Sequence, residues 1–228
     1  ISEIKALGLD MIEEAGSGHP GILLGAAPIL YTLYLNHLRF AGDNPNFYNR
    51  DRFIMSAGHG SSLLYSILYF AGYDLSLDDL KAFRRLHSKT PGHPEYNKTP
   101  GVEMTTGPLG QGFATAVGYA IAEKHTEALI NKKEKVIDYN IYCLCGDGDL
   151  MEGVSYEAAS IAGSLKLDNL IVLYDSNKVT MDGKIDDVFQ DDITKRFESM
   201  NWNVLKASDE PQDIDDAINK SKEANKPS

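Results

Sequence analysis

The hydrophobic pattern of the chain is clearest in two short apolar runs separated by a helical segment. The runs Ile141–Cys145 and Asn169–Tyr174 have the length and composition of buried strands. The segment between them predicts a helix that begins near Glu152 and carries small residues for close packing. A strand, a helix and a strand in this order predict a βαβ unit, whose strands pair in parallel through a right-handed crossover.

The same pattern, followed along the chain, extends this unit into one doubly wound α/β domain. Further strands are expected at Phe53–Ser56 and Trp202–Leu205, and a long loop with rigid Pro and Gly content at Ser88–Thr105. Further helices are expected from Ile4 to a stop at Gly16, at Ile22–Leu38, at Ser62–Ala71, from Ser76 to near Leu86, at Phe113–Asn131, from Asp191, and at Ile214–Ala224. We therefore expect a mostly parallel sheet with helices on both faces.

Polar residues follow the two strands of the βαβ unit. Gly146-Asp147-Gly148 follows the first strand, and Asn177 follows the second, with Val179 two residues later. Open α/β sheets bind ligands at the carboxyl ends of their strands. A carboxylate, an amide oxygen and a backbone carbonyl are hard oxygen ligands that suit Mg²⁺ beside phosphate oxygens, and a helix N-terminus adds N–H donors. The pattern favours a metal-bridged diphosphate site, although Asp and Asn also suit ordinary turns.

Three histidines lie in loops between Gly or Pro residues. They are His19, His59 and His93, in Ser17-Gly18-His19-Pro20-Gly21, Ala57-Gly58-His59-Gly60 and Pro91-Gly92-His93-Pro94. Glycines allow the backbone to approach a ligand closely, and proline stiffens a loop. Three such loops together favour a functional role over three core histidines. The other histidines, His37, His87 and His125, lie in or at the ends of helical patterns, and we interpret them as structural or surface residues.

Composition narrows the class of protein. A net charge of −11 and a pI near 4.9 argue against binding to nucleic acid or anionic membranes. The sequence has no membrane-length apolar run, and no signal peptide opens the chain. The two cysteines, Cys143 and Cys145, share one face of one strand, which predicts reduced core thiols in a cytosolic protein. A metal role for them would need further Cys or clustered His residues, which the sequence lacks.

Both ends of the sequence have the character of interior segments. Ile1 is not an initiator residue and leads directly into a helical pattern. Lys226-Pro227-Ser228 follows a helix and ends where an alternating fold would begin its next strand. We therefore expect a fragment, or the ordered part of a longer protein.

Taken together, these motifs resemble the N-terminal, diphosphate-binding domain of the transketolase family, and the resemblance covers essentially the whole chain. It rests on motifs that occur in the family's order. They are Ser17-Gly18-His19-Pro20-Gly21, Ser56-Ala57-Gly58-His59-Gly60, Thr90-Pro91-Gly92-His93-Pro94-Glu95, Gly107-Pro108-Leu109-Gly110-Gln111-Gly112, and Gly146-Asp147-Gly148 paired with Asn177.

The resemblance implies the thiamine diphosphate-binding fold and a transfer of a two-carbon ketol unit from a ketose phosphate to an aldose phosphate. The implied cofactors are thiamine diphosphate and Mg²⁺ or Ca²⁺. The metal would be held by Asp147, Asn177 and the Val179 carbonyl, and Gly146 and Gly148 would lie at the diphosphate. The turn of Gly107, Pro108 and Leu109 would lie against the pyrimidine and thiazolium rings.

The resemblance also assigns the loop histidines and the partners. His59 would touch the cofactor, and His19 and His93 would handle the hydroxyl protons of the donor sugar, a role that suits an imidazole. The implied partners are sugar phosphates and a second copy of the chain in a homodimer. The resemblance also counts Glu152 among the cofactor-binding residues. Glu152 and Glu157 resemble glutamates at the family's subunit contact, and the alternative is that they are simply acidic residues in the first turns of a helix.

The resemblance leaves part of the active site outside residues 1–228. The glutamate for the pyrimidine ring and the arginines for the sugar phosphate belong to the family's pyrimidine-binding and C-terminal domains, so this chain alone is expected to be inactive. Alternatives are a subunit of a split transketolase, an enzyme like 1-deoxyxylulose-5-phosphate synthase, or a non-catalytic metal–diphosphate-binding module. The Thr90–Glu95 motif favours transketolase over the synthase. A phosphatase using Asp147 would need a second acidic cluster, which the sequence lacks.

Overall fold

A parallel sheet of three strands in the order β1-β2-β3 forms the centre of the computed structural model. The strands are β1 (Arg52–Met55), β2 (Ile141–Gly146) and β3 (Leu170–Asp175). The structure describes every residue except 178, 181–182 and 185–187, and only the backbone of 179–180 and 183–184. In the register, Ile54 lies opposite Cys143, which lies opposite Val172. The predicted βαβ unit and the strand at residues 53–56 are therefore confirmed.

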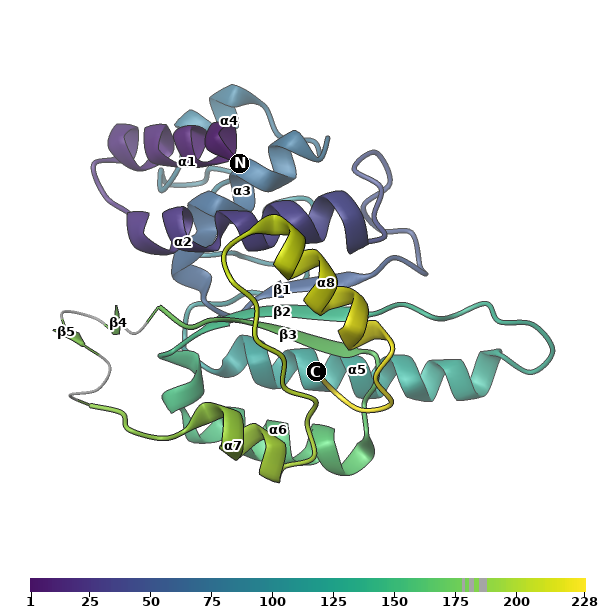
Figure 1. Ribbon diagram of the computed structural model, residues 1–228. Helices are drawn as coiled ribbons and strands as arrows, with labels where there is room; N and C mark the ends of the chain where they lie inside the picture. Colours follow the sequence, from purple (N-terminus) through teal and green to yellow (C-terminus); the bar gives the residue numbers. More distant parts are fainter. Residues whose placement is uncertain (178, 181–182, 185–187) are drawn as a thin grey trace.

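Helices cover both faces of this sheet (Figure 1). On one side lie α1 (Ser2–Ala15), α2 (Pro20–Thr32), α3 (Ser61–Phe70), α4 (Leu77–Lys81) and α8 (Pro211–Lys222). On the other side lie α5 (Gln111–Ile130), α6 (Gly153–Leu165) and α7 (Ile193–Ser199). A short antiparallel pair, β4 (Val179–Thr180) and β5 (Gly183–Lys184), extends beyond the carboxyl end of β3. The doubly wound α/β fold is confirmed.

Two hydrophobic clusters hold the layers together, one on each face of the sheet. Strand side chains alternate between the faces, so Tyr142 and Leu144 join the cluster with α1, α2, α3 and α8. Cys143 and Cys145 join the cluster with α5, α6 and α7. Both cysteines are fully buried and free, as predicted, and burial raises the pKa of each thiol well above its usual range. A nearly continuous apolar strand is what burial on both faces requires.

The helix boundaries depart from the prediction in two places. The helix expected from Ser76 to near Leu86 starts with the predicted cap, in which Ser76 and Asp79 exchange hydrogen bonds, but it ends at Lys81. Arg84 then has a φ of 61°, a left-handed conformation that cannot continue a helix. The helix expected at Ile22–Leu38 begins at Pro20, and its last turn, Leu33–His37, widens to a π-helical turn.

The strand predicted at Trp202–Leu205 is wrong, because these residues form no strand although the structure describes all of them. Backbone bonds on the free side of β3 go instead to Ser228, whose carbonyl accepts from Val172 N at 2.8 Å and whose N–H donates to Leu170 O at 3.1 Å. The apolar character of the segment has another origin. Trp202 is buried against Phe113 and Phe197, and its ring N–H donates to Ala159 O at 2.9 Å.

Within the described part of the chain, every helix is too short or too polar to cross a membrane.

Candidate functional site

The carboxyl ends of the strands bring the predicted site residues to one edge of the sheet. Ser56 and the His59 turn follow β1, Asp147 follows β2, and Asn177 follows β3. Gly146 and Asp175 are direct neighbours in the register of β2 and β3, so the last two turns start side by side. The position matches the ligand-binding edge of open α/β sheets.

Asp147 is a buried carboxylate at this edge, with 4% of its surface exposed. The Tyr174 hydroxyl donates a hydrogen bond to Asp147 Oδ1, and burial together with this carboxylate raises the pKa of Tyr174. Asp147 also borders a cavity of about 740 Å³ that Tyr174, Ser176 and α7 help to line. A carboxylate oxygen beside an open cavity is a hard ligand of the kind that Mg²⁺ prefers.

Asp175 lies near Asp147 and Asn177, and no motif in the sequence marks it. Burial raises the pKa of the Asp175 carboxyl, and the nearby charges of Asp147 and Asp209 raise it further. Asn177 Nδ2 donates to Asp175 Oδ2 at 3.2 Å. Val179 starts strand β4, where it pairs with Lys184. The described residues hold no cluster of three His, Cys, Asp or Glu that suits a metal ion, so the mixed set of one carboxylate, one amide oxygen and one carbonyl remains a prediction.

Two glycine turns meet at the edge. A Cβ on Gly148 would lie 3.0 Å from Leu109 Cδ1, so the turn of Gly107, Pro108 and Leu109 packs against the turn of Gly146–Gly148. Gly110 has a φ of 80° and closes the first turn before α5, and a Cβ there would lie 2.8 Å from Glu152 Cβ. Only glycine adopts this backbone conformation without strain.

The three loop histidines lie together, as their shared pattern predicts. The His19 ring centroid is 5.3 Å from that of His59 and 6.3 Å from that of His93. Burial lowers the pKa of all three imidazoles below 6.5, and Arg84 lowers the pKa of His19 and His93 further. The rings are therefore neutral at pH 7 and each offers one donor and one acceptor nitrogen.

The loop that carries His93 is anchored by α3. The single hydroxyl proton of Tyr65 is shared between Pro91 O at 2.9 Å and His93 O at 3.3 Å, and Ser61 Oγ donates to Gly92 O at 2.7 Å. Tyr65 itself is fully buried. These bonds fix a long loop that has no secondary structure of its own.

Sequence reasoning missed Arg84. Its guanidinium reaches Ser17 Oγ at 3.3 Å and His19 Nδ1 at 3.4 Å, and with His87 and His93 it lines a second cavity of about 620 Å³. The sequence predicts a helix that runs to near Leu86, and nothing in the sequence indicates the left-handed backbone of Arg84.

The other predicted residues fall outside this cluster. Glu152 and Glu157 are exposed at the start of α6. His87 and His125 are exposed, and His37 pairs with Asp215 of α8 at 3.0 Å, which confirms their interpretation as surface or structural residues.

The residues at the edge fit a metal-bound diphosphate, because hard oxygen donors, a glycine turn and neutral imidazoles meet where this fold binds phosphate-containing ligands. The fold and the site therefore define an α/β domain of the diphosphate-binding class. A family model, described as the thiamine diphosphate binding domain of transketolase, matches residues 1–228. The chain belongs to this family, and the resemblance predicted from its motifs is confirmed, as is thiamine diphosphate as the cofactor class.

Curated relatives of the chain include two bacterial transketolases. Transketolase of Bacillus subtilis is 55% identical over 210 residues, which cover 92% of this chain and 32% of that protein. Transketolase of Aquifex aeolicus is 53% identical over 230 residues, covering 100% of this chain and 33% of that protein. The chain thus spans about one third of the length of the curated relatives it matches.

Solved structures of transketolases superpose closely on this chain. Transketolase from Campylobacter jejuni superposes with a TM-score of 0.95 at 50% identity, covering 99% of this chain and 35% of that one. A transketolase from Pichia stipitis in complex with sedoheptulose 7-phosphate superposes with a TM-score of 0.96 at 45% identity, covering 99% and 34%.

Proposed function

We propose that the protein is a transketolase that uses thiamine diphosphate and a divalent metal to transfer a two-carbon ketol unit from a ketose phosphate to an aldose phosphate. Residues 1–228 supply its diphosphate-binding domain, and the pyrimidine-binding and C-terminal domains lie outside this chain. The observation that carries the proposal is the meeting of Asp147, the two glycine turns and three neutral histidines at one edge of the sheet.

In this proposal the metal is Mg²⁺ or Ca²⁺, held by Asp147, Asn177 Oδ1 and the Val179 carbonyl. Gly146 and Gly148 lie at the diphosphate, and Gly107, Pro108 and Leu109 form the wall for the rings of the cofactor. When bound, thiamine diphosphate supplies the nucleophilic carbon and the electron sink that cleavage next to a carbonyl requires. The protein's own part is to bind and orient the reactants.

The histidines move protons. Because their pKa values are lowered, His19 and His93 are neutral and can accept a proton from a hydroxyl of the donor sugar and return it. His59, which is less exposed than His19 and His93, contacts the cofactor. Arg84 keeps a positive charge beside His19, which favours the neutral form of that ring and suits an anionic substrate.

The proposed partners are sugar phosphates and a second copy of the chain, and the proposed location is the cytoplasm. Support for a homodimer comes from α6, where Val154, Ile161 and Leu165 share one helical face and are 41%, 50% and 56% exposed. Glu152 and Glu157 lie on the same helix, and we propose that they lie at the subunit contact.

Calorimetric titration tests the metal–diphosphate site. Thiamine diphosphate is titrated into the protein with and without Mg²⁺, and into the variants Asp147→Ala and Asp138→Ala. Asp138 is a matched control, because it is a carboxylate of the opposite edge of the sheet, bound to Arg39 and Asn49. We expect binding that requires Mg²⁺, is lost in Asp147→Ala and persists in Asp138→Ala.

Ketol transfer is assayed in parallel with xylulose 5-phosphate, a ligand of one matched Pichia stipitis structure. We expect turnover by the full-length protein and none by residues 1–228 alone. Metal-independent binding, or binding that Asp147→Ala retains, would contradict the proposed site, and turnover by the 228-residue chain would contradict the proposed division into domains.

A further inference from the structure

Asp149 is a buried carboxylate at the centre of the candidate site, next to the predicted cofactor residues but outside every role assigned so far. It follows Gly148 in the turn between β2 and α6, and its surface is 0% exposed. A carboxylate taken out of water is tolerated only where several donors replace its hydration. The donors around Asp149 therefore identify the segments that this carboxylate holds together.

Those donors come from three separate segments. Oδ1 accepts from Ser56 Oγ at 2.6 Å and from Gly110 N at 2.9 Å, and Oδ2 accepts from Gly146 N at 3.0 Å. Ser56 follows β1, Gly110 closes the turn before α5, and Gly146 ends β2. One side chain thus joins the three segments that carry His59, the Gly107–Leu109 turn and Asp147.

Further contacts make the arrangement rigid. Ser56 Oγ accepts from Phe113 N at 2.9 Å, so the hydroxyl bridges the start of α5 to Asp149. A Cβ on Gly112 would overlap Ser56 Cα, so α5 lies directly on the end of β1. Ser155 Oγ donates to the backbone carbonyl of Asp149 at 2.6 Å, which fixes the turn to α6.

We propose that Asp149 is a positioning residue of the thiamine diphosphate site, setting the spacing between the Gly107–Gly110 turn and the Gly146–Gly148 turn. This inference rests on the proposed function, since it concerns the same site. Asp149 touches neither reactant nor metal in this account and acts through the loops that it joins. Its charge also reaches His59, whose pKa it raises against the lowering effects of burial, His19 and His93.

The chemistry of the contacts demands a carboxylate rather than an amide. Both oxygens accept, and all three donors are N–H or O–H groups. In Asp149→Asn, either orientation of the amide would place its NH₂ group against at least one of these donors. The segment that carries this donor would lose its hydrogen bond to residue 149, and the two turns would no longer be held at one spacing.

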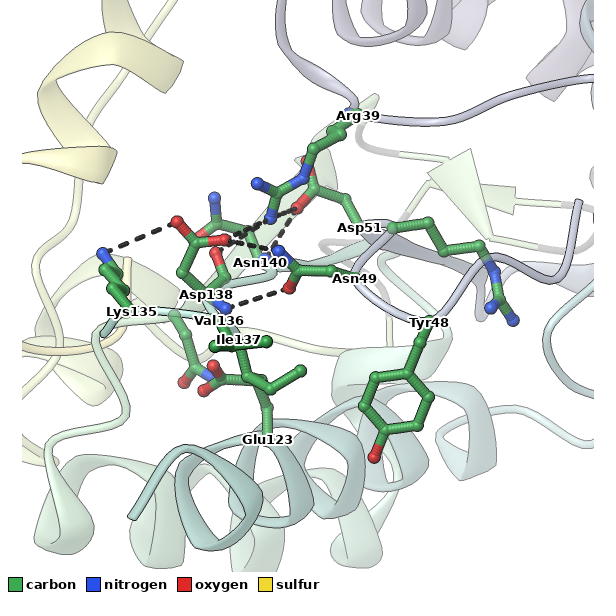
Figure 2. A network of polar contacts seen from close by, with 12 residues as sticks. Arg39, Tyr48, Asn49, Asp51, Glu123, Lys135, Val136, Ile137, Asp138 and Asn140 are labelled. Atoms are coloured by element: carbon green, nitrogen blue, oxygen red, sulfur yellow. Dashed lines mark hydrogen bonds and ion pairs between the residues drawn. The ribbon is translucent and has the colours of Figure 1, made fainter. Parts of the chain in front are cut away.

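Asp51 provides a matched control on the same sheet. It is 5% exposed, and each of its oxygens also accepts a backbone N–H, from Arg39 and from Asn140, at 2.8 Å in both cases. It precedes β1, at the opposite edge from the candidate site, where Figure 2 shows it between Arg39 and Asn140. Asp51→Asn therefore creates the same donor conflict away from the site.

The experiment compares Asp149→Asn, Asp51→Asn and the unchanged full-length protein. Affinity for thiamine diphosphate at saturating Mg²⁺ is measured by calorimetry, and exchange of the Gly110 and Gly146 amide protons is measured without the cofactor. We expect Asp149→Asn to bind about 10- to 100-fold more weakly, the usual effect of losing a group that orients the residues in contact with a metal. Both amides should exchange faster, while Asp51→Asn binds within about twofold of the unchanged protein, well under the 1.4 kcal/mol of a tenfold change.

A milder variant, Ser56→Ala, covers the case that Asp149→Asn does not fold. It removes one of the donors and should weaken binding about fivefold, the effect of one hydrogen bond. Unchanged affinity in the folded Asp149 and Ser56 variants, or an equal loss in Asp51→Asn, would overturn the positioning role alone. If the unchanged protein failed to bind thiamine diphosphate with Mg²⁺, the proposed function itself would fall, and this inference with it.

Discussion

Asp138 and Asp175, at the two edges of the central sheet, have pKa values that are shifted in opposite directions. At the amino edge, shown in Figure 2, Asp138 pairs with Arg39 at 2.8 Å and with Lys135 at 3.6 Å, and Asn49 donates to it at 3.0 Å. Burial alone would raise the pKa of Asp138, but these hydrogen bonds and the Arg39 charge outweigh it, and the pKa is lowered. The protein neutralises this edge with its own cations.

At the carboxyl edge, uncharged groups donate hydrogen bonds to each of three carboxylates. A tyrosine hydroxyl donates to Asp147, a serine hydroxyl and two backbone N–H groups donate to Asp149, and an amide donates to Asp175. Here the pKa of Asp175 is raised, by burial and by the neighbouring Asp147. Carboxylates of one sheet therefore differ in their surroundings: Asp138 is paired with cations of the protein, whereas Asp175 lies near another carboxylate.

The largest change in stability is expected from a substitution in helix α5, which begins at the carboxyl edge. Gly112→Ala would force a Cβ into the backbone of Ser56, so it should lower the free energy of unfolding by about 3 kcal/mol. Gly118→Ala, in the same helix, has nothing within 4 Å of the new Cβ and should raise stability by about 0.5–1 kcal/mol. Urea denaturation of both variants measures the difference, and equal effects would show that close packing is not confined to the site.

A smaller change in stability is expected at Glu123, which lies near the amino edge in Figure 2. Burial raises the pKa of Glu123 from 4.5 to about 7, and Asn169 Nδ2 donates to it at 2.7 Å. A raised carboxyl pKa means that the folded protein binds the proton more tightly than the unfolded one, so stability falls as the pH rises from 4.5 to 7.

Glu123→Gln imitates the protonated form, and it should therefore raise stability by about 1–2 kcal/mol at pH 8 and leave it unchanged at pH 4. Thermal unfolding of both proteins at the two pH values is the measurement. A variant that is less stable at pH 8 would show that the charged form is needed there.

The smallest effect concerns the histidines of the carboxyl edge. Their pKa values are lowered from 6.5, so the folded protein binds these protons more weakly than the unfolded chain. Their contribution to stability is complete above pH 6.5 and is lost as the pH falls below it. NMR titration of the ring protons should give midpoints below 6.5 for His19, His59 and His93. Midpoints above that value would show that burial does not dominate the titration of these rings.

Local patterns predicted most of the fold and the ends of the strands. The apolar runs of β2 and β3 and the turns that follow them placed Asp147 and Asn177 at one edge, because the carboxyl ends of parallel strands share an edge. The glycine and proline residues around His19, His59 and His93 marked the loops that meet there. Such features depend on neighbours in the sequence, and the sequence therefore reveals them.

Contacts across long sequence separations were not predictable. Asp149 and Ser56 are 93 positions apart, and nothing near either residue indicates the other. Arg84 reaches Ser17 across 67 positions, after a helix that ends earlier than its pattern indicates. The strand expected at Trp202–Leu205 was wrong for the same reason: Trp202 packs against Phe113 and Phe197, while Ser228 bonds to β3.

The two thiols at the centre of the sheet give the protein an internal reporter of its own opening. Cys143 and Cys145 are the only cysteines of residues 1–228, both are fully buried on the same face of β2, and burial suppresses the reactive thiolate form of each. An alkylating reagent can reach them only when the layer of α5 and α6 separates from the sheet. The rate of labelling therefore reports how often the core beneath the candidate site opens, without an introduced cysteine.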